Sequence, residues 1–222
     1  MNNIWFSADW HFSKWSRRKE ELQYDIKKDR DILRKYVASV DKDDIFIFLG
    51  DLTEVRDDNP RLVKRCIEQI KELPGNKIFI RGNNDQESDD YYINHLGFLA
   101  CYDKLEVDNF VFTHEPVQIN EGQINIHGHI HGCKTYWYCD AKNHVDAYIK
   151  LFNNYPIKIG PLLYKGNCID KDLIEDGLMV EKLKSSLFGY VNRLKEIEEY
   201  FGVPIIFKTG IETFDDYFRN DI

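Results

Sequence analysis

Four short, mainly apolar runs constrain the fold of this chain more than any other feature. They span residues 4–8, 45–49, 77–81 and 109–113. The second run, Ile-Phe-Ile-Phe-Leu, has no polar member, which is typical of a strand covered on both faces. Residues 16–40 and 60–73 carry apolar side chains at helical spacing between the runs. The alternation of strands with amphipathic helices predicts an α/β fold.

Polar residues follow each of these runs. Asp9 and His11 follow the first, Asp51 the second, Asn83 comes just after the third and His114 follows the fourth. In layered α/β folds, ligands bind in the crevice at the carboxyl ends of the strands. We therefore expect these side chains to lie close together in space.

A histidine repeat occupies residues 125–132, Asn-Ile-His-Gly-His-Ile-His-Gly. On an extended strand, side chains two residues apart point the same way, so the repeat predicts a metal site on one side of a strand. Gly128 and Gly132 fit a turn that lets a bound group approach closely. The alternative is a solvated histidine cluster in a polar loop. The three histidines are His127, His129 and His131.

The candidate ligands comprise two carboxylates, one amide and four imidazoles. Seven ligands are too many for one ion and suit two. Oxygen and nitrogen donors without thiolate favour divalent Mn, Fe, Co, Ni or Zn. Two ions ~3.5–4 Å apart can clamp a phosphate and lower the pKa of a water molecule. The set is Asp9, His11, Asp51, Asn83, His114, His129 and His131.

Five motifs in order resemble those of the calcineurin-like metallophosphoesterases, in particular their small phage and bacterial branch. The resemblance covers residues 4 to about 132. It implies a two-sheet metallophosphoesterase sandwich flanked by helices, and metal-dependent hydrolysis of phosphate esters as a phosphatase or phosphodiesterase. The motifs are Asp9-Trp10-His11, Gly50-Asp51, Gly82-Asn83-Asn84-Asp85, Thr113-His114 and Gly128-His129-Ile130-His131. Residues 145–148 and 155–157 also match segments that commonly follow in that branch.

The resemblance implies two ion sites, with manganese as the expected metal. His127 would lie just outside them and orient a neighbouring ligand or a phosphate. By the same resemblance, the first ion is held by Asp9, His11 and His131, the second by Asn83, His114 and His129, and Asp51 bridges both.

One position departs from the family pattern. The family usually has a histidine where this chain has Asn84, and that histidine, held by the following acid (here Asp85), helps to stabilise or protonate the leaving oxygen. Asparagine can donate a hydrogen bond but cannot transfer a proton at neutral pH. Three outcomes are open: a preference for phosphodiesters or aryl esters, replacement of the lost group by His127 or Arg81, or a weakened enzyme that mainly binds phosphate. Asn84, Arg81 and Arg17 are the candidate contacts to the substrate.

The formal net charge of −8 excludes a broad positive field that would attract long polyanions. Phosphorylated small molecules or nucleotides are therefore the expected substrates, and nucleic acid would need a local grip. Five cysteines without a Cys-x-x-Cys pair indicate reduced thiols. The sequence shows neither a signal-peptide pattern nor an apolar stretch of ~18 residues, so we expect a cytoplasmic protein (host cytoplasm if viral) without a membrane partner. The oligomeric state stays open.

The last third of the chain changes character. Residues 134–164 are rich in tyrosine and β-branched residues, which predicts strands that complete a second sheet. Residues 172–201 have apolar side chains at helical spacing and predict one long or two shorter helices. We expect a metallophosphoesterase domain at residues 1–165 and a helical C-terminal extension at residues 166–222, either packed on it or appended to it. A short helix is also expected at residues 88–96, capped by Ser88.

Overall fold

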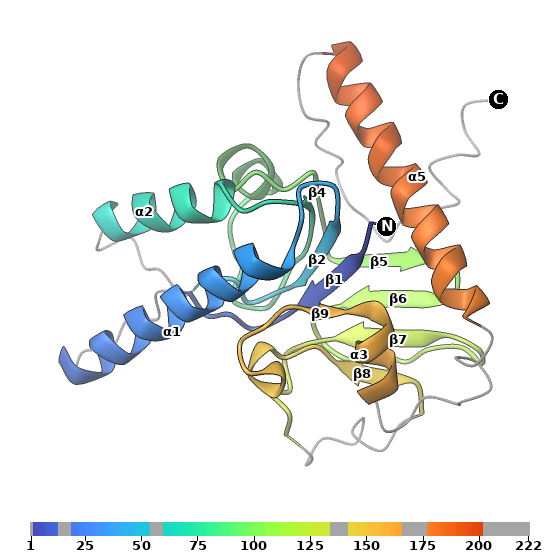
Figure 1. Ribbon diagram of the computed structural model, residues 1–222, viewed down its shortest axis with the longest axis horizontal. Coiled ribbons are helices and arrows are strands. Elements are labelled where there is room, and N and C mark those ends of the chain that lie inside the picture. Colours follow the sequence, from blue (N-terminus) through green and yellow to red (C-terminus); the bar gives the residue numbers. More distant parts are fainter. Residues whose placement is uncertain (1, 13–18, 54–59, 134–141, 166–176, 202–222) are drawn as a thin grey trace.

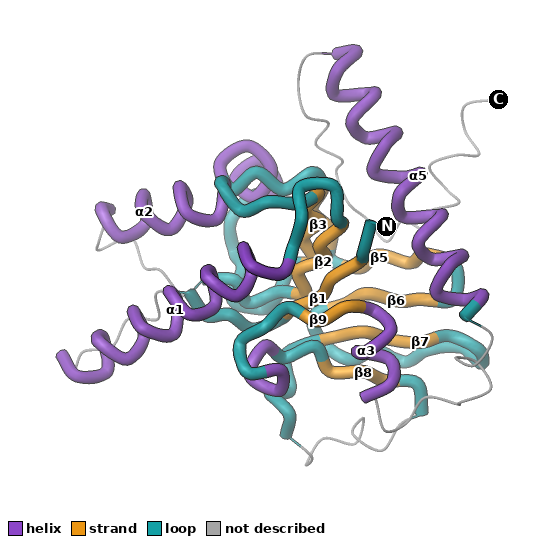
Figure 2. The backbone as a smooth tube through the Cα atoms, viewed as in Figure 1, coloured by secondary structure: helices purple, strands orange, loops and turns teal. Residues whose placement is uncertain are grey.

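The computed structural model describes residues 2–12, 19–53, 60–133, 142–165 and 177–201. Two sheets pack face to face, with some helices over the outer side of one sheet and others packed against the core between the sheets (Figure 1). This is the α/β sandwich flanked by helices that the sequence predicts. Figure 2 shows the strands in the middle of the molecule, with α1 and α2 together on one side and α5 on another.

The first sheet has the strand order β4-β3-β2-β1-β9. β1 to β4 run parallel to one another, and β9 pairs antiparallel with β1. All the carboxyl ends of the four parallel strands therefore meet at one edge. The strands are β1 (Ile4–Ser7), β2 (Ile45–Leu49), β3 (Asn76–Ile80), β4 (Ala100–Tyr102) and β9 (Ile157–Lys158).

The second sheet has the order β5-β6-β7-β8. β5 is antiparallel to β6, and β6, β7 and β8 are parallel. β8 joins the second sheet as predicted for residues 134–164, but β9 from the same segment pairs with β1 in the first sheet, so that prediction is only half right. Strands β4 and β5 were not predicted. The strands are β5 (Lys104–Val107), β6 (Phe110–Thr113), β7 (Ile124–His127) and β8 (His144–Asp146).

Strand β2 shows why the apolar runs are continuous. Ile45 and Ile47 belong to the core between the two sheets. Phe46 and Phe48 belong to a second core, between the first sheet and the helices α1 and α2. Alternate side chains of a strand point to opposite faces, so a strand covered on both faces needs apolar residues at every position. Tyr36 of α1 stacks edge-on against Phe46, with 4.7 Å between the ring centroids.

Helices α1 and α2 confirm the predictions for residues 16–40 and 60–73. α1 is one continuous helix, and α2 begins at Pro60, a residue that fits the first turn because that turn needs no backbone donor. The helix predicted at residues 88–96 is found as a shorter, five-residue π-helix at residues 91–95. The helices are α1 (Lys19–Ser39), α2 (Pro60–Lys71), the π-helix η1 (Tyr91–His95), the 3-10 helix η3 (Ile149–Phe152), α3 (Ile159–Lys165) and α5 (Leu178–Phe201).

Helix α5 packs against the same core as the two sheets. Leu183, Leu187 and Val191 are buried at helical spacing and belong to the cluster between the sheets. The division of the chain near residue 165 stays a prediction. None of the helices in the described ranges is long and apolar enough to cross a membrane.

Candidate metal centre

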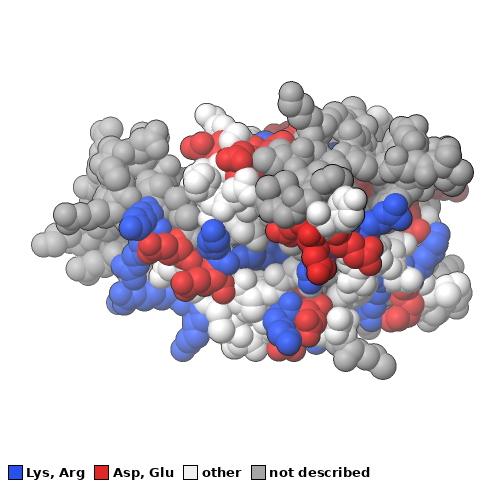
Figure 3. All heavy atoms as spheres, turned by 90° about the horizontal axis from the view of Figure 1, so that it is seen from above, with Lys and Arg blue, Asp and Glu red and all other residues white. Residues whose placement is uncertain are grey.

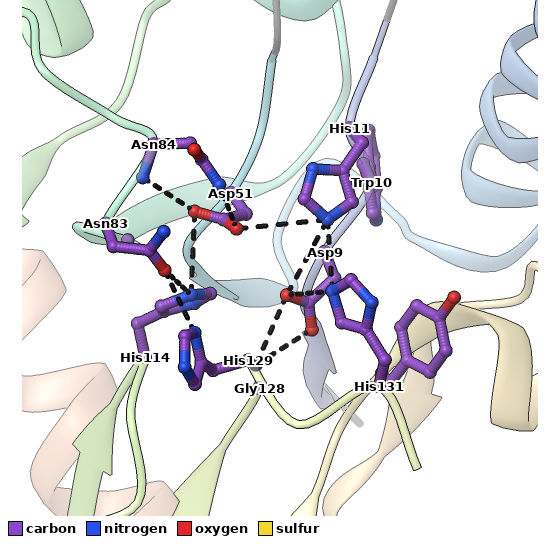
Figure 4. Close-up of polar contacts among 12 residues, drawn as sticks. Asp9, Trp10, His11, Asp51, Asn83, Asn84, His114, Gly128, His129 and His131 are labelled. Carbon is purple, nitrogen blue, oxygen red and sulfur yellow. Dashed lines mark hydrogen bonds and ion pairs between the residues drawn. The ribbon is translucent and has the colours of Figure 1, made fainter. Parts of the chain in front are cut away.

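The candidate ligands converge at one edge of the sandwich (Figure 4). Asp9 and His11 follow β1, Asp51 follows β2 and Asn83 lies after β3. The second sheet contributes His114 after β6, and it also contributes His129 and His131 after β7. Both sheets thus bring their carboxyl ends to the same place, as the strand order predicts.

A first group contains Asp9, His11 and His131. The Nε2 atom of His131 lies 3.2 Å from Oδ1 of Asp9 and 3.1 Å from Nε2 of His11. Ligand atoms of all three residues lie within 4.8 Å of one another, close enough to share an ion. These are the residues that the family resemblance places on the first ion.

A second group contains Asn83, His114 and His129. The Oδ1 atom of Asn83 lies 3.0 Å from Nε2 of His114 and 2.9 Å from Nδ1 of His129. One amide oxygen therefore faces two imidazole nitrogens, a donor set suited to a borderline divalent ion. These are the residues that the resemblance places on the second ion.

Asp51 lies between the groups. Its Oδ2 atom is 3.8 Å from Nε2 of His11, and its Oδ1 atom is 3.5 Å from Nε2 of His114. Each oxygen of one carboxylate thus faces a different group. Asp9 is also within reach of Asp51 and His114, so distance alone allows Asp9 to serve either group.

The residues present fit cations chemically. Asp9 and Asp51 are 1% and 2% exposed, and in the described part of the chain their ion-pair partners are histidines, not lysine or arginine. Burying a carboxylate without a compensating charge is costly, and cations at this place would remove the cost. The facing Nε2 atoms of His11 and His131 cannot both carry a proton at 3.1 Å, but both can present lone pairs to an ion.

The backbone of the site is strained. Positive φ angles are found at nine non-glycine residues among those described, and five of them are candidate ligands. Such conformations cost ~1–3 kcal/mol each and persist where the surrounding structure enforces them, typically at functional sites. The five are Asp9 (57°), His11 (44°), Asp51 (56°), His129 (67°) and His131 (52°).

The histidine repeat does not behave as the sequence predicts. β7 ends at His127, so His129 and His131 lie in a loop, and the three imidazoles do not share one side of a strand. Positive φ angles at residues 129 and 131 direct these two side chains to different groups. His127 is 2% exposed, its Nδ1 lies 2.9 Å from the Gly128 carbonyl oxygen, and burial lowers its pKa to about 4.

Asn84 and Asp85 both act on the Asp51 segment. The side-chain amide of Asn84 donates to Oδ2 of Asp51 at 2.7 Å, and its backbone N–H donates to Oδ1 at 3.0 Å. Asp85 is buried and accepts from the backbone N–H groups of Asp51 (2.6 Å), Gly82 (2.8 Å) and Leu52 (3.1 Å). Burial raises the pKa of Asp85. Asp85 therefore positions the loops after β2 and β3, a role other than the expected support of residue 84.

The candidate substrate arginines do not join the group. The guanidinium of Arg81 donates to Asp103 at 3.1 Å, to the carbonyl of Glu87 and to Asp89, so all three nitrogens are engaged away from the ligands. This placement holds the loop after β3, and it gives the predicted phosphate contact of Arg81 no support. Arg17 lies outside the described residues.

The sequence reasoning assigned no role to three residues that border the site. Nζ of Lys28 donates to the carbonyls of Trp10 (2.9 Å) and His11 (3.1 Å), and helical spacing carries no signal for this. Asp146 accepts from two backbone N–H groups, and burial raises its pKa to about 7. Tyr148 stacks on His131. For Asp146 and Tyr148 the sequence did carry a signal, because residues 145–148 match a segment that is common in the family branch.

A two-sheet α/β sandwich with acids and imidazoles at one edge defines the metallophosphoesterase class. The chain belongs to the calcineurin-like phosphoesterase family, whose model matches residues 3–207. The match reaches well beyond residue 132, where the recognised motifs end, and it includes α5.

Solved structures are similar at low identity. The protein of unknown function AQ665 from Aquifex aeolicus is 21% identical, with a TM-score of 0.50 over 71% of this chain and 96% of that chain. The nuclease MPE from Pseudomonas putida is 21% identical, with a TM-score of 0.38 over 58% of this chain and 60% of that one. The first likeness supports the fold alone, and the second is too weak to carry an argument. The search of curated proteins found no match.

Proposed function

We propose that this chain hydrolyses phosphate esters at a centre of two divalent ions. The observation that supports this most directly is the position of Asp51, whose two oxygens face His11 and His114 in separate ligand groups. A carboxylate in that position can bind two ions at once. A site for one ion would not need a second set of donors on the other side of this carboxylate.

Manganese is the ion we propose first, with iron, zinc, nickel or cobalt as alternatives that the nitrogen and oxygen donors also accept. Bound there, two such ions would supply Lewis acidity to a phosphate and make hydroxide from water near neutral pH. The chain's own part is to hold the donors in place, through strained backbone at Asp9 and Asp51 and through the hydrogen bonds that Asp85 accepts.

Asn84 favours phosphodiesters and aryl esters over alkyl monoesters. Its side chain is exposed beside Asp51, where its amide can donate a hydrogen bond to a substrate oxygen. An amide cannot protonate the leaving oxygen, and absence of a general acid costs ~10²–10⁴-fold in rate. The loss matters least when the leaving group is already a weak base. A phosphodiesterase acting on nucleotides is therefore the second candidate function.

Charge supports small substrates over long nucleic acid. The net charge is −8, and on the face seen in Figure 3 the basic side chains of the described residues lie next to acidic ones, without forming an extended positive surface among themselves. Long polyanions are held by many phosphate contacts at once, which need such a surface. We propose a nucleotide or another small phosphorylated compound as the substrate.

The test compares p-nitrophenyl phosphate with bis-p-nitrophenyl phosphate, using metal-stripped protein reloaded with Mn²⁺. We expect hydrolysis of both, a higher rate on the diester, and loss of both rates in Asp51→Ala. Asp43→Ala is the matched control, because Asp43 is an exposed carboxylate in a turn before β2. Two bound ions without turnover of either ester would identify a phosphate-binding module. A chain that retains no metal would refute the proposal.

A further inference from the structure

The ring of Tyr148 covers one face of the His131 imidazole. The two rings are nearly parallel, with an interplanar angle of 13° and 4.7 Å between centroids. Tyr148 is 8% exposed, whereas His131 is exposed and lies in the loop after β7. The loop after β7 alone would let the His131 imidazole rotate. The buried ring of Tyr148, stacked on one face of the imidazole, restricts this rotation.

The carboxylate of Asp146 joins the two partners through the backbone. Its Oδ2 accepts from the N–H of Gly132 at 2.8 Å, and its Oδ1 accepts from the N–H of Tyr148 at 2.8 Å. Gly132 directly follows His131. One partly buried carboxylate thus sets the distance between the histidine loop and the tyrosine that stacks on it.

The same segment also borders Asp9, the buried carboxylate of the first group. Ala8 forms a bridge with Tyr148, its N–H donates to the carbonyl of Ala147 at 3.1 Å, and its carbonyl accepts from Ile149 at 3.2 Å. In the second group, His114 is supported from elsewhere, since its Nδ1 lies 2.8 Å from the Leu49 carbonyl oxygen at the end of β2.

We propose that Asp146 and Tyr148 position His131 and thereby set the affinity of the first ion site without affecting the second. The inference rests on the proposed two-ion function. Neither residue needs to touch the ion, because each acts on the orientation of its ligand. Groups that orient a ligand in this way typically change metal affinity ~10–100-fold.

The experiment is a calorimetric Mn²⁺ titration of metal-stripped full-length chains, with the electron paramagnetic resonance signal of coupled Mn²⁺ pairs as a second measurement. We expect Tyr148→Ala to weaken one of the two binding events ~10–100-fold and to leave the other unchanged. Tyr148→Phe should bind as the parent chain does, because the phenyl ring keeps the stacking. Tyr164→Ala is the control, since this tyrosine is 84% exposed on α3.

Asp146→Asn provides an independent route if the tyrosine variant does not fold. Asparagine retains one acceptor oxygen, so one of the two N–H groups loses its partner and the same binding event should weaken. Unchanged titrations in both variants, or equal loss of both ions in Tyr148→Ala, would overturn the inference. A parent chain that binds fewer than two ions would instead refute the proposed function, before any variant is compared.

Discussion

Gly128 lies where the loop after β7 comes closest to the end of β1. A Cβ added there would stand 2.5 Å from Cβ of Ala8, 2.8 Å from Oδ2 of Asp9 and 3.2 Å from the carbonyl oxygen of Leu49. Carbon atoms pack at about 3.5–4.0 Å, so Gly128→Ala forces a displacement of about 1 Å. The Ala8 Cβ and the Leu49 carbonyl oxygen cannot rotate away, and the Asp9 carboxylate is held by hydrogen bonds.

The expected cost follows from the crowding. Overpacking of a closely packed interior destabilises by ~1–3 kcal/mol. For a chain of this length each kcal/mol lowers Tm by ~2–4 °C, so Gly128→Ala should melt ~2–12 °C below the parent chain. The backbone N–H of His129 donates to both oxygens of Asp9, at 3.2 and 3.1 Å. The displacement should therefore also move a candidate ligand and weaken Mn²⁺ binding.

Differential scanning calorimetry of metal-stripped protein measures the first effect, and titration with Mn²⁺ measures the second. Gly160→Ala is the matched control, because an added Cβ there meets nothing within 4 Å and no positive φ angle is involved. Its Tm should not fall below that of the parent chain. Equal Tm values and equal metal affinities for the two alanine variants would refute the steric reasoning.

Three further predictions follow from single residues. Asn84→His should raise kcat on alkyl phosphate monoesters by up to ~10²-fold, because it restores a proton donor; unchanged rates would mean that residue 84 does not face the leaving group. Lys77 is buried, donates to the carbonyls of Ile70 (2.8 Å) and Lys71 (3.1 Å), and burial lowers its pKa from 10.5 to about 8. Between pH 8 and 10.5 the unfolded chain therefore binds more protons than the folded chain, so the unfolding free energy of the parent should rise by roughly 3 kcal/mol across this range relative to that of Lys77→Met. If chemical denaturation shows the same pH dependence of the unfolding free energy for both proteins, the prediction is wrong. Gly189 lies in the middle of α5, and an added Cβ there meets no atom within 4 Å. Gly189→Ala should therefore raise the unfolding free energy by roughly 0.5–1 kcal/mol in the same assay. A lower unfolding free energy would show that the position is crowded.

Strands β1 to β3 of the first sheet and the order of the candidate ligands along the chain could be predicted from the amino-acid pattern alone. A strand covered on both faces has an apolar residue at every position, so residues 45–49 could be recognised locally. The polar residue after each such strand, Asp51 among them, followed from the same pattern. Strand β4 was missed because three residues are too few to show a period, and β5 because its sequence Lys-Leu-Glu-Val contains no continuous apolar run.

Only the tertiary structure decided how the side chains are directed. The strand ends at His127, and positive φ angles in the loop turn His129 and His131 to different partners, which a period of two residues cannot express. Arg81 follows β3 as a ligand would, yet Asp89 and Asp103 engage it elsewhere.

The physical reason is the range of the interactions. Secondary structure follows from contacts within a few residues, and those leave a regular pattern in the chain. The bond between Asp9 and His131 joins residues 122 positions apart, and the stacking of Tyr148 on His131 depends on a turn after another strand. Such contacts form only when both sheets are packed. The residue pattern along the chain therefore predicted the candidate ligands, whereas the group that each one joins was predicted only by the family resemblance.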